Sequence, residues 1–261
     1  MAEKSSYQVI TIPALGDNFI YLCLYNKGHV LAIDPCDASA VLDALMKHAL
    51  KLTTVLVTHH HLDHTGGVEE LKKETSCQVI GADKSRIPGI DQVVDDGQIL
   101  TIDNAKIQAI ATPGHTNTSV CFYMYLTNSN QPGILFTGDT LFVNGCGRIL
   151  EGNAQTMLNS LLKLASLPDD TLVYCGHDYT VENYEFALTL EPDNEAIRKR
   201  LEEVKQAVSE GRQTIPSTIS QEKQTNPFFR AGTSEIKAAL NMSGAKTEDV
   251  FAELRRRKDI F

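Results

Sequence analysis

Four short apolar segments of this 261-residue chain run into a histidine or an aspartate in the same way. They read VLVTHHH, AIATPGH, ILFTGD and LVYCGH, with a small or turn-forming residue just before the polar one. Short apolar runs bounded by such residues are typical of buried strands. Strand ends are rigid positions, so strands that each present an imidazole or a carboxylate at their end predict one shared site. The polar residues are His59, His61, His115, Asp139 and His177.

The segment THHHLDHTGG, residues 58–67, holds four of the chain's eight histidines. Residues two apart in an extended segment face the same way, so His59 and His61 can share one metal ion. Asp63 and His64 follow at the turn into the next predicted helix and can face a second position. His60 lies between the first two ligands, and we expect it to point away and to be structural.

The residue types in this pattern indicate a metal site. Neutral imidazole and carboxylate are ligands of Zn²⁺ and of similar ions, and iron or manganese also accepts such a set. Seven ligands are too many for one tetrahedral ion but suit two divalent ions that share one carboxylate, with room for water on each. A closed structural zinc site is the main alternative, but it usually takes four Cys or His ligands, and no cysteine has such spacing here. The seven residues are His59, His61, Asp63, His64, His115, Asp139 and His177.

Charge and composition limit the classes of partner. A formal net charge of −9 disfavours a nucleic-acid binder, which needs a basic face. No apolar run approaches the roughly 20 residues of a membrane helix, and the N-terminus lacks the apolar core of a signal peptide. The six cysteines form no CxxC pair, which fits reduced thiols. We therefore expect a cytoplasmic protein that acts on a small molecule, with no nucleic acid, membrane or obligate protein partner.

The order of predicted elements changes along the chain. Strands alternate with helices up to about residue 178, which indicates a mixed α/β domain. Helical periodicity then dominates, at 182–192, 194–210, 234–241 and 247–258, and residues 211–229 are predicted to form a loop. We accordingly predict a catalytic domain at 1–178 and a helical substrate-binding domain at 179–261.

Longer motifs around the histidines carry a family resemblance. THHHLDH, TPGHT, FTGDTLF and YCGHDYT together resemble the metallo-β-lactamase superfamily. PALGDNFIYL, GDTLFVNGCGR, EPDNEAIRKRL, TNPFFR and RRRKDIF resemble, over essentially the whole chain, its glyoxalase II or hydroxyacylglutathione hydrolase family. The resemblance implies an αββα sandwich, with helices on both outer faces of two sheets, and a C-terminal all-helical domain that completes the substrate pocket.

The resemblance also implies roles for the ligands. His59, His61 and His115 would hold the first ion, Asp63, His64 and His177 the second, and Asp139 would bridge them. Asp34 is either a partner of the ligands or a turn residue at a strand end. The implied reaction is hydrolysis of the thioester S-D-lactoylglutathione to D-lactate and glutathione, the second step of methylglyoxal detoxification. A hydroxide that bridges the metals attacks, and Asp63 and Asp139 take part in catalysis.

Substrate binding is implied at a second group of residues. Glutathione conjugates carry two carboxylates, so a local cationic patch must overcome the net negative charge of the chain. Two positions depart from some members of the family, which have Lys in place of Arg148 and Tyr in place of Leu150. Arg keeps the charge, and a backbone N–H contact at Leu150 does not depend on the side chain. The implied substrate-binding residues are Arg148, Leu150, Tyr179, Arg255 and Lys258.

Other functions remain open from the residues alone. A glutathione persulfide dioxygenase shares the histidine motif but uses one iron, so metal stoichiometry separates the two. A β-lactamase would usually be secreted, and a nuclease of the same fold would need a basic surface. Outside enzymes, the chain could be an inactive metal-binding module.

Overall fold

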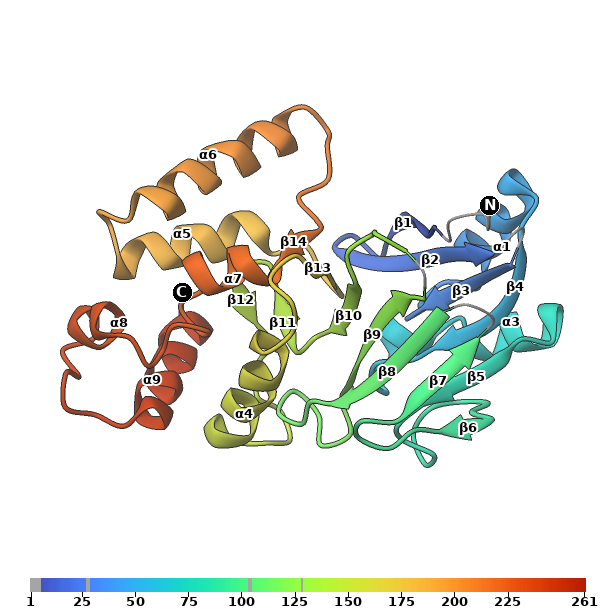
Figure 1. The fold of residues 1–261 in the computed structure, drawn as a ribbon, viewed down its shortest axis with the longest axis horizontal. Helices are drawn as coiled ribbons and strands as arrows, with labels where there is room; N and C mark the ends of the chain where they lie inside the picture. Colours follow the sequence, from blue (N-terminus) through green and yellow to red (C-terminus); the bar gives the residue numbers. More distant parts are fainter. Residues whose placement is uncertain (1–5, 27–28, 103–104, 128) are drawn as a thin grey trace. The chain divides into compact units, whose positions relative to one another are not determined.

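The computed structural model describes residues 6–26, 29–102, 105–127 and 129–261 (Figure 1). The chain forms two compact units. The N-terminal unit comprises Met1–Ala111 and Thr118–Gly138, and the C-terminal unit comprises Thr112–Asn117 and Asp139–Phe261. Among the described residues, no helix is long and apolar enough to cross a membrane.

The first sheet of the N-terminal unit contains its strands in sequence order. The first three strands pair antiparallel, and the later ones pair parallel. Parallel neighbours need a crossover connection. The helix at 38–48 supplies it between the third and fourth strands, and the helix at 68–75 between the fourth and fifth. The strands are β1 (Gln8–Ala14), β2 (Asn18–Asn26), β3 (His29–Ile33), β4 (Lys51–Leu56), β5 (Gln78–Gly81) and β6 (Gln92–Val93).

Helices α1 (Ala38–His48) and α3 (Val68–Thr75) cover one face of this sheet. Their buried residues Val41 and Leu45, and Val68 and Leu71, belong to one hydrophobic cluster with residues of β2 to β5. Asp37 caps α1 by accepting hydrogen bonds from the backbone N–H groups of residues 39 and 40. A helical layer therefore packs on the first sheet.

The second sheet of the N-terminal unit runs in the order β10, β9, β8, β7, with antiparallel pairing. Its strands are β7 (Ile99–Ile102), β8 (Ala105–Ala111), β9 (Val120–Leu126) and β10 (Ile134–Gly138). The two sheets pack face to face: the rings of Tyr21 and Phe136 lie 5.6 Å apart, and Cys23 Sγ lies 3.9 Å from Met124 Sδ. The inner layers of the predicted sandwich are thus present in this unit.

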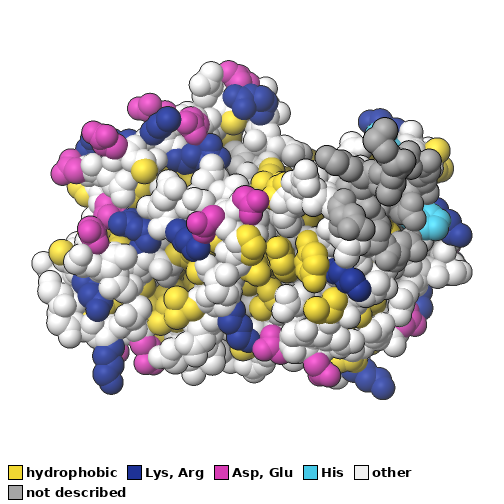
Figure 2. All heavy atoms as spheres, in the orientation of Figure 1, with side chains coloured by type: hydrophobic (Ala, Val, Ile, Leu, Met, Phe, Trp, Pro, Cys, Tyr) yellow, Lys and Arg dark blue, Asp and Glu magenta, His cyan; other side chains and the backbone are white. Residues whose placement is uncertain are grey.

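The C-terminal unit is mainly helical (Figure 1). On the face drawn in Figure 2, Lys and Arg side chains are interleaved with Asp and Glu side chains over α5 (Thr180–Leu190) and α6 (Glu195–Ser209). Its short strands are β11 (Leu141–Phe142), β12 (Gly145–Cys146), β13 (Leu172–Cys175) and β14 (Ser217–Thr218). Its helices are α4 (Ala154–Ala165), α5 (Thr180–Leu190), α6 (Glu195–Ser209), α7 (Ile219–Thr225), α8 (Ser234–Ala239) and α9 (Thr247–Asp259).

The predicted loop at 211–229 is wrong in part, because it contains β14 and α7. Helix α7 has little apolar periodicity, since a buried Glu222 stands where a hydrophobic residue would reveal its inner face. The sequence feature that predicts the start of α7 is the capping box TISQ, in which Thr218 and Gln221 exchange side-chain-to-backbone hydrogen bonds. The remaining predicted helices of this region are present, and β14 is the exception to an all-helical region after residue 178.

Candidate metal centre

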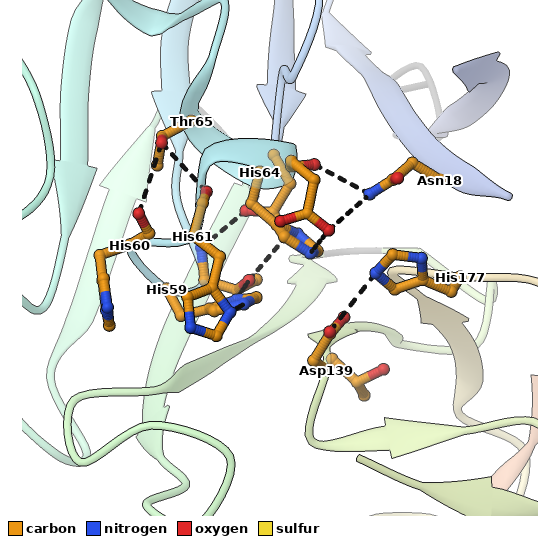
Figure 3. A network of polar contacts seen from close by, with 12 residues as sticks. Asn18, His59, His60, His61, His64, Thr65, Asp139 and His177 are labelled. Atoms are coloured by element: carbon orange, nitrogen blue, oxygen red, sulfur yellow. Dashed lines mark hydrogen bonds and ion pairs between the residues drawn. The ribbon is translucent and has the colours of Figure 1, made fainter. Parts of the chain in front are cut away.

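The histidine-rich segment follows β4 in the N-terminal unit and leads into α2 (Leu62–Thr65) (Figure 3). His59 Nε2 lies 3.0 Å from His61 Nδ1, and His64 Nε2 lies 3.6 Å from Asp63 Oδ2. Two ligands of one tetrahedral ion are about 3.3 Å apart when each bond is about 2.0 Å. Both pairs therefore have a spacing that suits joint binding of an ion.

Asp34 holds this segment in place. Its Oδ1 accepts from the Thr58 N–H at 2.7 Å, and its Oδ2 accepts from Thr58 Oγ1 at 2.6 Å and pairs with His64 Nδ1 at 2.9 Å. An acceptor on Nδ1 fixes which imidazole nitrogen faces a metal, so His64 presents Nε2 toward Asp63. These contacts support the interpretation of Asp34 as a partner of the ligands.

His60 has different neighbours from the other histidines (Figure 3). Its Nε2 lies 3.2 Å from Arg86 Nη1, and the same guanidinium contacts Asp83 and Thr118. Hydrogen bonds from Ser85, Arg86 and Thr118 hold the pKa of the Asp83 carboxyl well below its usual range, although burial opposes them. These contacts fit the predicted structural role of His60.

Gly138 ends β10 against the metal-binding segment. A Cβ at this position would lie 2.2 Å from Thr58 Oγ1, and the residue has φ of +47°. Only glycine combines that backbone conformation with so close an approach. Close packing against Thr58 within the N-terminal unit therefore explains the glycine of the ILFTGD motif.

Asp139 lies between two histidines in the C-terminal unit. Its Oδ2 is 3.4 Å from His177 Nε2 (Figure 3). The same oxygen is 3.5 Å from His115 Nε2. His115 Nδ1 donates to the Arg148 carbonyl at 2.9 Å, which directs Nε2 toward Asp139. One carboxylate that faces two imidazoles is the arrangement expected of a shared ligand.

The surroundings of these residues leave little room for movement. A Cβ on Gly147 would lie 1.8 Å from the Asp139 carbonyl oxygen, so the hairpin formed by β11 and β12 packs directly on the backbone of Asp139. The Tyr179 ring stacks on His177 with ring centroids 5.2 Å apart, and Phe142 meets both rings edge-on. These contacts keep the imidazole of His177 in place.

A pocket of about 280 Å³ opens beside Asp139 in the C-terminal unit. It brings together four of the five predicted substrate-binding residues. Leu150 is not among its lining residues; its side chain is exposed, and its N–H donates to the His115 carbonyl at 3.3 Å. The lining residues are His115, Asp139, Phe142, Cys146, Gly147, Arg148, Tyr179, Glu182, Asn183, Arg255, Lys258 and Asp259.

Arg255 and Lys258, the two predicted substrate-binding residues of α9, both have acidic partners. The Arg255 guanidinium contacts Asp259 Oδ1 at 3.0 Å through Nε and at 2.9 Å through Nη2, and Lys258 forms an ion pair with Glu182. Sequence reasoning missed both acids. The i,i+4 spacing of Arg255 and Asp259 was readable on a helix, whereas the pairing of Lys258 with Glu182 joins two different helices.

Cys146 is the cysteine in this pocket. It is buried, and its burial raises the pKa of the thiol to about 11, although the nearby Arg255 acts in the opposite direction. A thiol with this pKa stays protonated near neutral pH. Its burial and its raised pKa fit a structural role for Cys146 and not that of a nucleophile.

Comparison with known proteins places this arrangement in a family. The model of the metallo-β-lactamase superfamily matches residues 24–177. The structure resembles that of ETHE1 from Myxococcus xanthus, with a TM-score of 0.65 and 25% identity over 96% of this chain and 90% of that one. The chain is therefore a member of the metallo-β-lactamase superfamily, and the predicted fold is confirmed.

The C-terminal residues define the family more narrowly. The model named "Hydroxyacylglutathione hydrolase C-terminus" matches residues 178–261. A hydroxyacylglutathione hydrolase from Methylococcus capsulatus is 45% identical over 97% of this chain and 98% of its own length. One from Chromohalobacter salexigens is 46% identical over 97% and 99%. The chain belongs to the hydroxyacylglutathione hydrolase family.

Proposed function

We propose that this protein hydrolyses S-D-lactoylglutathione to D-lactate and glutathione. The observation that carries the proposal is the pocket of the C-terminal unit, where predicted glutathione-binding residues line the same space as Asp139 and His115. The names of its curated relatives support the same reaction.

Family membership and the clusters of His and Asp indicate that the protein binds divalent metal. We propose two ions per chain, with Zn²⁺ as the first choice and iron or manganese as alternatives. His59, His61 and His115 would hold one ion and Asp63, His64 and His177 the other, with Asp139 shared. The short ligand separations in each unit fit this assignment.

When bound, the metal ions supply Lewis acidity and lower the pKa of a water toward about 7, so that a hydroxide nucleophile is available. The chain's own residues orient the substrate. Arg148, Arg255 and Lys258 offer positive charge to the glycine carboxylate. Tyr179 lies beside His177, where it can contact the peptide near its sulfur. The departing thiolate is a good leaving group because the corresponding thiol has a pKa of about 8.5.

An assay with metal-loaded protein tests the proposal. We expect turnover of S-D-lactoylglutathione by protein that carries about two ions per chain, and loss of that turnover after chelation. One iron per chain with oxygen uptake on glutathione persulfide would support the dioxygenase instead. A fully metallated protein that turns over neither compound would be the inactive metal-binding module.

The basic tail offers a test of substrate binding. Arg255→Ala combined with Lys258→Ala is expected to raise KM for S-D-lactoylglutathione well above tenfold, because two largely buried cations that would contact the glycine carboxylate are lost together. Steady-state kinetics measure it. Arg256→Ala with Arg257→Ala is the matched control, since it removes the same charge from α9 at residues that pair with Glu253. An unchanged KM in the first variant would remove the tail from the substrate site.

We also propose a cytoplasmic location and two domains with different functions. The six cysteines are all buried free thiols, which fits a reducing compartment. Residues 1–178 would supply the catalytic domain and residues 179–261 the substrate-binding domain, with no obligate protein partner.

A further inference from the structure

Glu182 lies in the first turn of α5 and lines the pocket together with Lys258. Its side chain is 58% exposed, and its carboxylate forms an ion pair with the Lys258 ammonium. The pair joins two helices, α5 and α9, that both border the pocket. An acidic residue at this position is unexpected in a site that must attract a carboxylate.

Lys258 depends on a nearby anion. Its side chain is only 8% exposed, and its Nζ lies 5.7 Å from the centre of the Phe186 ring and 5.1 Å from that of Phe261. The aromatic faces stabilise the cation in part, but a poorly hydrated ammonium still favours a carboxylate partner. Within the pocket of this structure, Glu182 is that partner.

Arg255 makes a different set of contacts from Lys258. Its Nη1 donates to the Cys146 carbonyl at 2.7 Å, its Nε and Nη2 contact Asp259, and its guanidinium lies 5.1 Å above the Phe228 ring. These contacts fasten the β11–β12 hairpin to α9. Of Arg255 and Lys258, the lysine is therefore the one whose partner can leave, because Glu182 is more exposed than Asp259 and can turn into water.

We propose that Glu182 competes with the glycine carboxylate of glutathione for the Lys258 ammonium. Glu182 thereby sets the affinity of the pocket for glutathione-containing ligands and the release of product. The inference rests on the proposed function of the pocket. One ammonium cannot fully neutralise two carboxylates, so the ligand must displace Glu182 or bind against its repulsion. Glu182 thereby weakens binding of ligands with that carboxylate and leaves ligands without it unaffected.

Calorimetry on metal-loaded Glu182→Gln tests this inference with S-methylglutathione, which has no thioester to hydrolyse. We expect Kd to fall roughly fivefold, the upper range for loss of a competing ion pair in which only the acid is exposed. The matched control is Glu185→Gln, which removes the same charge from α5 at a residue that pairs with Lys205 at 2.7 Å; its Kd should equal that of the wild type. S-methylglutathione with an amidated glycine should bind both variants and the wild type alike.

The outcomes separate this inference from the proposed function. Tighter binding by Glu182→Gln that disappears with the amidated ligand supports the competition, even if the wild type hydrolyses no thioester. An unchanged or higher Kd in Glu182→Gln overturns it, even if hydrolysis is rapid. Equal tightening with both ligands also overturns it, because the glycine carboxylate would then play no part.

Discussion

Replacing Asp139 with asparagine is expected to lower kcat/KM for S-D-lactoylglutathione on the order of a thousandfold, or about 4 kcal/mol of transition-state stabilisation. Asp139 Oδ2 faces both His115 Nε2 and His177 Nε2 at 3.5 and 3.4 Å. The amide keeps the shape of the side chain but removes its negative charge and one acceptor oxygen. A neutral group cannot hold two cations close together, so metal content should fall below two ions per chain.

Metal analysis and kinetics on the same preparations measure the effect. Asp193→Asn is the control, because it makes the same chemical change at a side chain that is 97% exposed. The shared-ligand interpretation would be wrong if Asp139→Asn kept both its metal and its activity. A loss of activity with full metal content would instead assign Asp139 a role other than holding the ions.

The strands that carry the candidate ligands can be predicted from the sequence because each is marked by a local run of apolar residues. The segments before His59, His115, Asp139 and His177 form β4, β8, β10 and β13, as their apolar runs predict. The same four segments carried the candidate ligands, so strand prediction and site prediction rested on one pattern. In the N-terminal unit, the spacing rule for His59 and His61 also holds, since their ring nitrogens lie 3.0 Å apart.

The parts that sequence reasoning missed depend on distant pairs. Lys258 and Glu182 are 76 residues apart, and their pairing has no periodicity to reveal it. The sequence predicts a cationic patch in the C-terminal segment RRRKD, whereas the structure adds an acid beside Arg255 and another beside Lys258. Charge pattern along a sequence gives the number of cations, but their partners depend on how the helices pack.

Glu222 is another residue whose role only the packing reveals. It is completely buried in α7 of the C-terminal unit, and its Oε2 accepts from the Asn144 N–H and from Asn226 Nδ2, both at 2.8 Å. Asn226 Nδ2 also donates to the Gly145 carbonyl at 3.0 Å. The carboxyl thus fastens the β11–β12 hairpin, whose next residues line the pocket. Burial raises the pKa of Glu222 from 4.5 to about 7, although its hydrogen bonds oppose the shift.

Stability should therefore depend on pH through Glu222. Its pKa is higher in the folded than in the unfolded state, so its contribution is fully present below about pH 4.5 and is lost as pH rises through about 7. Between about pH 5 and 8 the loss should amount to roughly 2–3 kcal/mol of unfolding free energy. Glu222→Gln cannot ionise but keeps an acceptor oxygen, so it should lack this dependence and be more stable than the wild type at about pH 8.

Urea unfolding of the wild type and Glu222→Gln at matched metal content, across that pH range, measures the difference. Other groups titrate equally in both proteins, so the difference between the two curves isolates Glu222. Glu185→Gln, with the same charge change at a side chain that is 43% exposed, should run parallel to the wild type. If Glu222→Gln also ran parallel, the buried carboxyl would have to be ionised throughout. Its two N–H donors would then stabilise the anion enough to offset its burial.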